Sequence, residues 1–188
     1  MKKMTEENVK GAFAGESQAH VKYAAFSEKA KNENMPNIGR LFAAASYAEQ
    51  VHATAHLRVL KGIGSTVENL GGAIDGEAFE VAEMYPAFIA VAEAQGEPSA
   101  KTSFSRAMDA EKVHHDLYAK SREAAAAGKD ADLADIWVCS GCGWTGEGEA
   151  PDKCPLCGAP NNMLIKFLKG SGKLCSRTYY RCALTWQA

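Results

Sequence analysis

The sequence contains the stretch Tyr47-Ala48-Glu49-Gln50-Val51-His52 and, later, the stretch Ala110-Glu111-Lys112-Val113-His114, which share the pattern Glu-x-x-His. Residues three apart lie on one face of a helix, so each stretch can present a carboxylate and an imidazole to the same point. A lone glutamate precedes the glutamate of each stretch at a similar distance, Glu16 by 33 residues and Glu80 by 31. The repeat predicts two helical hairpins that form a four-helix bundle with a two-metal carboxylate site.

Helical periodicity extends this pattern along most of the chain. Apolar residues recur three and four apart over about residues 5–31, and after a break at residues 32–36 the same spacing continues to Gly62. We expect a glycine-rich connection over residues 65–76, followed by a third helix that Pro86 bends. A fourth helix then ends near Gly128. The chain is therefore mainly α.

Acidic residues occupy the predicted inward faces of these helices. A lone Glu-x-x-His is more often a solvated helix face, but several buried carboxylates are strongly unfavourable unless cations accompany them. The five glutamates among the candidate ligands carry five negative charges, which match two divalent or trivalent ions better than one divalent ion. Oxygen-rich ligation with two imidazoles suits iron or manganese better than zinc or copper. We expect two iron ions. The candidate ligands are Glu16, Glu49, His52, Glu80, Glu83, Glu111 and His114.

Glu83 is a surplus carboxylate in this set. It lies one helical turn after Glu80, so a metal could exchange ligands between them as its charge changes. His20 and His56 share the inward faces, and we expect them beside the ligands rather than on a metal.

Four cysteines form a second candidate metal site. Cys139 and Cys142 make one Cys-x-x-Cys-Gly knuckle, and Cys154 and Cys157 make another after eleven intervening residues. Four thiolates form a tetrahedral site for iron or zinc, and the glycine after each pair permits a tight turn. The spacing predicts metal binding but does not decide between iron and zinc.

Composition excludes several classes of partner. The formal net charge is -2 with charges of both signs interspersed, so neither nucleic acid nor an anionic membrane is expected as a partner. No apolar signal segment or membrane span is evident, and paired cysteines favour a reducing compartment, so we expect a cytoplasmic protein.

Residues 170–188 match neither part of the chain. Their Gly-Ser-Gly start is typical of a linker or cloning remnant, which leaves Cys175 and Cys182 outside the functional interpretation.

The combination of a dimetal bundle and two cysteine knuckles resembles the rubrerythrin family. Supporting stretches beyond the two Glu-x-x-His motifs are Ala14-Gly15-Glu16-Ser17 and Glu80-Val81-Ala82-Glu83-Met84-Tyr85-Pro86. The resemblance implies a ferritin-like di-iron domain over residues 1–135 and a rubredoxin-like domain over 136–169, with the atypical tail beyond them.

The resemblance also implies an activity. A non-haem di-iron peroxidase would reduce hydrogen peroxide to water, with electrons passing through one iron held by the four cysteines. Glu49 and Glu111 would bridge the two irons, and Glu80 with His114 would bind one of them. Glu16 would bind the other, together with Glu83 in the oxidised state or His52 in the reduced state.

The electrons would come from an external NAD(P)H-linked reductase or a rubredoxin-type carrier, because no phosphate-binding Gly-x-Gly-x-x-Gly loop follows a predicted strand. The family resemblance implies a homodimer or larger assembly, and the long connection over residues 65–76 would let hairpins exchange between subunits in a domain swap. Two other functions stay open at this point: a ferritin-class iron oxidase or store, and a non-redox interaction protein with zinc in its knuckles.

Overall fold

Two compact units make up the described part of this computed structural model, which covers residues 1–170. The first unit ends at Gly64 and the second begins at Ser65. None of the helices in the described range is both long and apolar enough to cross a membrane. Cys175 and Cys182 lie outside the described residues.

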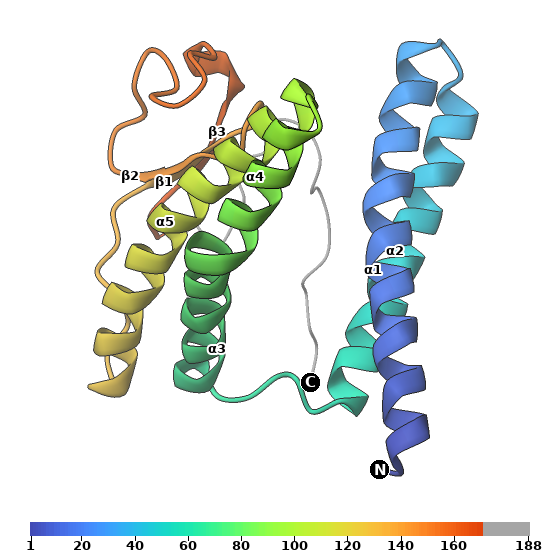
Figure 1. Ribbon diagram of the computed structural model, residues 1–188, viewed down its shortest axis with the longest axis horizontal. Helices are drawn as coiled ribbons and strands as arrows, with labels where there is room; N and C mark the ends of the chain where they lie inside the picture. Colours follow the sequence, from blue (N-terminus) through green and yellow to red (C-terminus); the bar gives the residue numbers. More distant parts are fainter. Residues whose placement is uncertain (171–188) are drawn as a thin grey trace. The chain divides into compact units, whose positions relative to one another are not determined.

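The first unit is a hairpin of two long antiparallel helices, α1 (Lys3–Asn32) and α2 (Pro36–Val59) (Figure 1). Asn34 adopts a left-handed conformation with φ of 59°, and the N–H of Met35 donates to the carbonyl of Ala30 at 2.9 Å. This is the helix-ending arrangement that a left-handed residue permits, and proline then suits the first turn of the next helix. The predicted break at residues 32–36 is confirmed.

Small polar residues bring the two helices of this hairpin together. Ser27, which is buried, donates its hydroxyl to the carbonyl of Gly39 at 2.8 Å. A Cβ on Gly39 would lie 3.1 Å from the carbonyl oxygen of Ser27, so glycine allows the close approach. Nearer the acidic cluster, Ser46 donates to the carbonyl of His20 at 2.8 Å, and its own carbonyl lies 2.9 Å from Nδ1 of His20. The interhelical hydrogen bonds thus set the register of the hairpin.

The second unit starts with a helix where a loop was predicted. Helix α3 spans Thr66–Phe79, so the expected glycine-rich connection over residues 65–76 is wrong. Ser65 and Glu68 form a capping box, in which the Ser65 hydroxyl accepts the N–H of Glu68 and the Glu68 carboxylate accepts the N–H of Ser65. Glycines in a helix interior cost about 1 kcal/mol each relative to alanine, and this cap with tertiary packing offsets that cost. The linker between the hairpins is correspondingly short.

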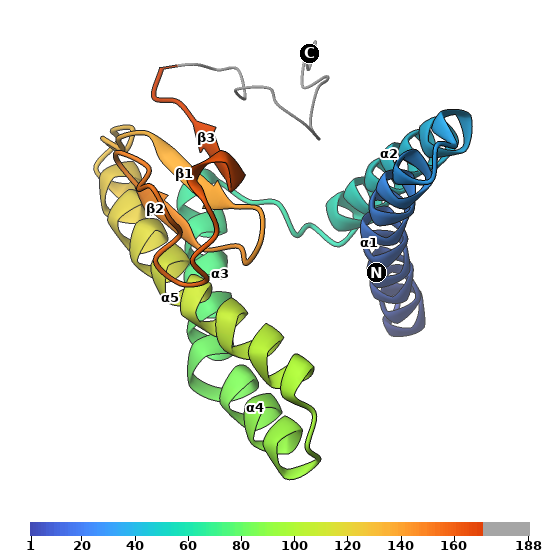
Figure 2. The same ribbon diagram turned by 90° about the horizontal axis from the view of Figure 1, so that it is seen from above.

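A widened turn follows α3. The π-helical segment η1 (Glu80–Met84) leads into α4 (Tyr85–Ala94), and the N–H of Tyr85 donates to the carbonyl of Glu80, five residues back. Pro86 explains the turn, because proline has no N–H for the carbonyl four residues earlier and its ring would clash with it. The structure therefore has a widened turn where the sequence predicted a bend. After α4, α5 (Pro98–Ala126) runs back antiparallel to α3 and α4 (Figure 2).

The two hairpins are repeats of one another. Each carries an aromatic cluster with ring centroids about 5.5 to 6.5 Å apart, tilted or edge to face, at equivalent positions. A constant offset of 62 residues relates the pairs Tyr23 and Tyr85, Phe26 and Phe88, and Phe42 and Phe104. The same offset relates the two Glu-x-x-His motifs.

A small antiparallel sheet follows α5 in the second unit. Strands β1 (Ile136–Cys139), β2 (Thr145–Glu147) and β3 (Leu164–Phe167) pair in the order β2-β1-β3, and the 3-10 turn η2 (Asn161–Met163) precedes β3. Val138 pairs with Thr145 on one side and with Ile165 on the other. The buried core of this module is Trp137, Cys139, Cys154 and Leu164. Such a small apolar core makes metal binding a large part of its stability.

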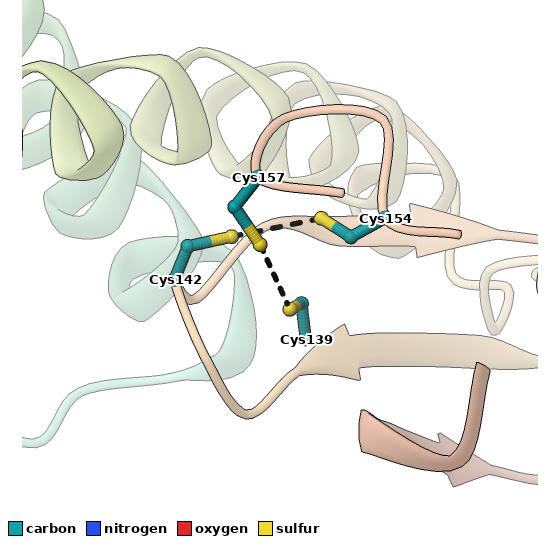
Figure 3. A group of neighbouring side chains, drawn as sticks. All are labelled: Cys139, Cys142, Cys154 and Cys157. Atoms are coloured by element: carbon teal, nitrogen blue, oxygen red, sulfur yellow. Dashed lines mark hydrogen bonds between the residues drawn. The ribbon is translucent and has the colours of Figure 1, made fainter. Parts of the chain in front are cut away.

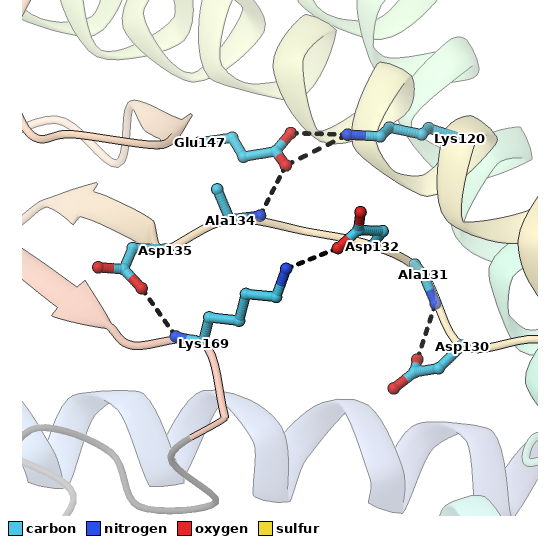
Figure 4. A network of polar contacts seen from close by, with 8 residues as sticks. All are labelled: Lys120, Asp130, Ala131, Asp132, Ala134, Asp135, Glu147 and Lys169. Carbon is cyan, nitrogen blue, oxygen red and sulfur yellow. Dashed lines mark hydrogen bonds and ion pairs between the residues drawn. The ribbon is translucent and has the colours of Figure 1, made fainter.

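Polar contacts tie this module to α5 and to the segment between them (Figure 4). Glu147 of β2 accepts from Nζ of Lys120 on α5 at 3.0 Å and from the backbone N–H of Ala134 at 2.8 Å. Lys169 donates its backbone N–H to Asp135 and its ammonium group to Asp132. Exposed ion pairs contribute little to stability because water screens their charges. The pair of Glu147 and Lys120 joins β2 to α5, and the contacts of Lys169 join the end of the module to the segment before β1.

We predict that Gly146→Ala destabilises the module. A Cβ at this position would overlap the six-membered ring of Trp137, which stacks on the glycine, and overpacking of this kind costs about 1–3 kcal/mol. The measurement is urea unfolding of the metal-loaded protein followed by tryptophan fluorescence. Gly141→Ala is the matched control, because its added Cβ would make only ordinary van der Waals contacts, with Met163 at 3.4 Å, the Cys139 sulfur at 3.7 Å and Ala159 at 3.9 Å. Equal midpoints for the two variants would contradict the packing argument.

Candidate metal centres

The four predicted cysteines converge in the second unit (Figure 3). The sulfurs of Cys139 and Cys157 are 3.6 Å apart, as are those of Cys142 and Cys154, and all four lie within 4.8 Å of one another. Metal–sulfur bonds of about 2.3 Å in a regular tetrahedron would separate the sulfurs by about 3.8 Å. The donor set therefore fits a single tetrahedral ion.

Backbone amides of the two knuckles stabilise thiolate charge. Gly143 and Gly158 adopt left-handed φ values of 80° and 74°, which lets the chain turn tightly after each second cysteine. A hydrogen bond from the backbone N–H of Ala159 is the main reason that the pKa of the Cys157 thiol is lowered to about 7. Burial instead raises the pKa of Cys142 to about 12. A bound cation would offset the cost of ionising the buried thiols.

In the first unit, Glu16 of α1 lies beside Glu49 and His52 of α2, with one ligand atom from each within 4.8 Å of the others. Nδ1 of His52 is 2.9 Å from Oε2 of Glu49. That hydrogen bond, followed by a contact with Glu16, lowers the pKa of the Glu49 carboxyl. This Glu, Glu, His cluster is the one that the sequence predicted for the first hairpin.

In the second unit, the matching cluster is Glu77 of α3 with Glu111 and His114 of α5. Nδ1 of His114 is 2.6 Å from Oε2 of Glu111 and 3.8 Å from Oε1 of Glu77. Burial, and then repulsion by Glu111, raises the pKa of the Glu77 carboxyl. A divalent cation would relieve both effects, so this donor set also fits a metal.

Sequence inspection missed Glu77, and the repeat explains why. The offset between hairpins is 62 residues at Glu49 and Glu111, but Glu16 and Glu77 are 61 apart. The second hairpin has one additional residue between this glutamate and the following tyrosine, which the widened turn η1 accommodates. Aligning the aromatic residues of the two repeats would have revealed Glu77 as the partner of Glu16.

Glu80 and Glu83 both lie in the widened turn η1. Glu80 is half-buried, and burial followed by repulsion from Glu111 raises the pKa of its carboxyl. Glu83 is exposed, and neither residue belongs to the three-residue clusters of the described chain. Their ligand roles stay predictions.

Comparison with known proteins gives the family. The family model described as Rubrerythrin matches residues 7–121, and the model described as Rubrerythrin, rubredoxin-like domain matches residues 137–164. The chain belongs to the rubrerythrin family. Rubrerythrin-2 of Clostridium acetobutylicum is 38% identical over 87% of this chain and 97% of that protein. Nigerythrin of Nitratidesulfovibrio vulgaris is 35% identical over 87% of this chain and 86% of that protein.

Solved structures of nigerythrin agree with this assignment. Its partially reduced state and its fully reduced, all-ferrous state each match with a TM-score of 0.51 at 33% identity, covering 87% of this chain and 86% of theirs. The predicted mainly α, ferritin-like fold with a rubredoxin-like module is confirmed. So are the cofactors, a di-iron site with carboxylate and histidine ligands and one iron in the four-cysteine site. Rubrerythrins are oxidoreductases of peroxidase type, which is the general class of this chain.

We predict that Cys157 is the first cysteine of the metal-free, reduced module to be alkylated. The thiolate is the nucleophile, so its rate rises as pH passes through about 7, while Cys142 with a pKa of about 12 stays protonated. Iodoacetamide labelling over a pH series, resolved by tandem mass spectrometry, measures each rate. Iron loading should protect all four cysteines. Uniform rates at Cys142 and Cys157 would contradict the assignment.

Proposed function

We propose that this chain reduces hydrogen peroxide to water at a di-iron site, with electrons entering through the four-cysteine iron. The observation that carries the proposal is the pair of equivalent Glu, Glu, His clusters in a chain that also holds a four-thiolate site. When bound, the irons supply the two electrons that, with two protons, convert one peroxide into two waters. A storage role would leave the four-cysteine iron without a use.

The proposed ligand set combines both clusters with the neighbouring carboxylates. Glu49 and Glu111 are equivalent residues of the two hairpins and would hold the metals, while His52 and His114 would offer imidazole nitrogens beside them. The raised pKa values of Glu77 and Glu80, each caused first by burial, support a cation beside both residues. We therefore expect Glu77 to pair with His114 and the surplus carboxylate to be Glu80 rather than Glu83.

The electron donor is proposed to be a separate NAD(P)H-linked reductase or a rubredoxin-type carrier. Among residues 1–170 the sheet is three short antiparallel strands, and no parallel strand leads into a helix as a dinucleotide site requires. Free cysteines in the described module support a cytoplasmic location as part of this proposal.

The two clusters are proposed to face each other in a four-helix bundle of a homodimer or larger assembly. A two-helix layer must bury its apolar face against a second layer. Large apolar side chains on the first hairpin remain exposed in the described chain, which supports such a partner surface: Val21, Phe26, Ile38, Leu41 and Val51. The second layer would come from the same chain or, in a domain-swapped assembly, from another.

We predict that Glu77→Gln, Glu80→Gln and His114→Ala each lower peroxide turnover at least about tenfold, because even residues beside a ligand cost about 10–100-fold when removed. Glu83→Gln should lower it less. The assay follows NADH consumption by iron-loaded protein supplied with a reductase, a rubredoxin-type carrier and peroxide. Glu93→Gln, which removes an exposed carboxylate of α4, is the control. Wild-type protein that consumes no peroxide would overturn the function, and a larger loss in Glu83→Gln than in Glu80→Gln would reverse the ligand choice.

A mixed dimer tests where the two layers come from. One chain carries Glu16→Ala and His52→Ala, the other carries Glu111→Ala and His114→Ala, and different affinity tags isolate the mixed species. If hairpins are exchanged, one of its two sites is built from wild-type hairpins only, and we expect about half the wild-type turnover. If each site belongs to one chain, both sites are defective and turnover is lost.

A further inference from the structure

One hydrogen bond joins the second carboxylate cluster to the cysteine module. Nε2 of His114, on α5, lies 2.7 Å from Oγ1 of Thr145, the first residue of β2. Thr145 is only 6% exposed, so solvent does not compete for this contact. The two residues are 31 positions apart in the chain, and the bond crosses from the helical part of the unit to the sheet.

The other ring nitrogen of this histidine faces the carboxylates. Nδ1 of His114 is 2.6 Å from Glu111, so both nitrogens of the ring have partners and its orientation is defined. If Nδ1 binds a cation, the ring proton is on Nε2 and donates to the Thr145 oxygen. The Thr145 hydroxyl in turn donates to the carbonyl of Gly143 at 3.2 Å. Every group in this chain of bonds then has a compatible donor or acceptor role.

The carbonyl at the end of this chain belongs to a cysteine knuckle. Gly143 directly follows Cys142, and its N–H donates to the carbonyl of Cys139 at 2.9 Å. Thr145 and Glu147 are two apart on β2 and so lie on one face of the strand, and Glu147 pairs with Lys120 of α5. One face of β2 therefore makes two separate contacts with the helix that carries His114.

The repeat offers an internal comparison. The side chain of His52, the equivalent residue of the first hairpin, is 56% exposed, whereas that of His114 is 26% exposed. Both histidines make the same contact with the glutamate three residues earlier. The hydrogen bond to Thr145 is what distinguishes the second histidine within its own unit.

We propose that Thr145 is a positioning residue for His114. Its hydroxyl accepts a hydrogen bond from the Nε2–H of His114. This bond holds the ring so that Nδ1 faces Glu77 and Glu111, and it couples their cluster to the cysteine module of the same chain. The inference rests on the proposed function only in that the cluster binds a metal. Partners of a metal-binding histidine's second nitrogen fix its tautomer and ring orientation.

The test uses zinc as a diamagnetic probe in full-length protein labelled with ¹⁵N-histidine. Zinc first fills the four-cysteine site, and further titration by calorimetry measures the affinity of the carboxylate and histidine cluster. Nuclear magnetic resonance then follows the Nε2–H proton of His114, assigned by its disappearance in His114→Ala. We expect Thr145→Val, which keeps the side-chain shape and removes the hydroxyl, to lower zinc affinity about 10–100-fold and to speed exchange of this proton with water.

Two variants make the result specific. Thr145→Ser keeps the hydroxyl and should retain affinity and slow exchange, whereas equal losses in the serine and valine variants would mean that the packing of the whole side chain, not the hydroxyl, sets the affinity, which overturns the proposal. Thr102→Val is the control, because this hydroxyl donates within α5 to the carbonyl of Pro98. Should Thr145→Val fail to fold, as judged by its four-cysteine absorption with cobalt, the comparison of wild type, Thr145→Ser and Thr145→Ala decides.

The outcomes separate this inference from the proposed function. Wild-type protein that lacks a slowly exchanging Nε2–H, or a valine variant with wild-type affinity, would overturn the role of Thr145 whatever the peroxide assay shows. Absence of peroxide turnover in wild type would overturn the function and leave the affinity and exchange results intact.

Discussion

Carboxylates on the packed faces of helices are the constraint on which the rest of this structure depends. Each hairpin places two glutamates and a histidine within 4.8 Å of one another, and the glutamates of both clusters are partly buried. Desolvation and mutual repulsion disfavour such charges, as the raised pKa of Glu77 shows. Cations remove this cost, so folding of the hairpins and binding of metal are linked. The hairpins themselves are held by contacts away from the charges, including the aromatic clusters and the bond from Ser27 to Gly39.

The widened turn before Pro86 shows how one backbone feature changes a metal site. A single additional residue in η1 rotates the preceding part of the helix relative to the following part. Glu77 thereby becomes the equivalent of Glu16, and Glu80 is left half-buried near Glu111 as an additional carboxylate. The first hairpin has a regular helix at this position and no such surplus residue. The two otherwise matching repeats therefore differ in the carboxylates that they place beside their Glu-x-x-His motifs.

The cysteine module depends on the backbone as much as on its thiols. Left-handed glycines after each knuckle turn amide groups toward the sulfurs, and the small core around Trp137 and Leu164 keeps the strands in register. Its strand β2 also faces α5, where Thr145 and Glu147 contact His114 and Lys120. The four-cysteine site and the cluster of Glu77, Glu111 and His114 are therefore neighbours within one unit of the chain.

The sequence by itself determined the features that follow from local spacing. Glu-x-x-His on a helix, the break before Pro36 and the two Cys-x-x-Cys-Gly knuckles each depend on a few adjacent residues, and each was predicted correctly as a structural element. Tertiary structure decided the helix at Thr66–Phe79, the place of Glu77 and the contact of His114 with Thr145. Helical periodicity cannot reveal an additional residue in a widened turn, since it shifts the pattern without abolishing it. A hydrogen bond across 31 residues depends on how β2 packs against α5, which no local pattern encodes.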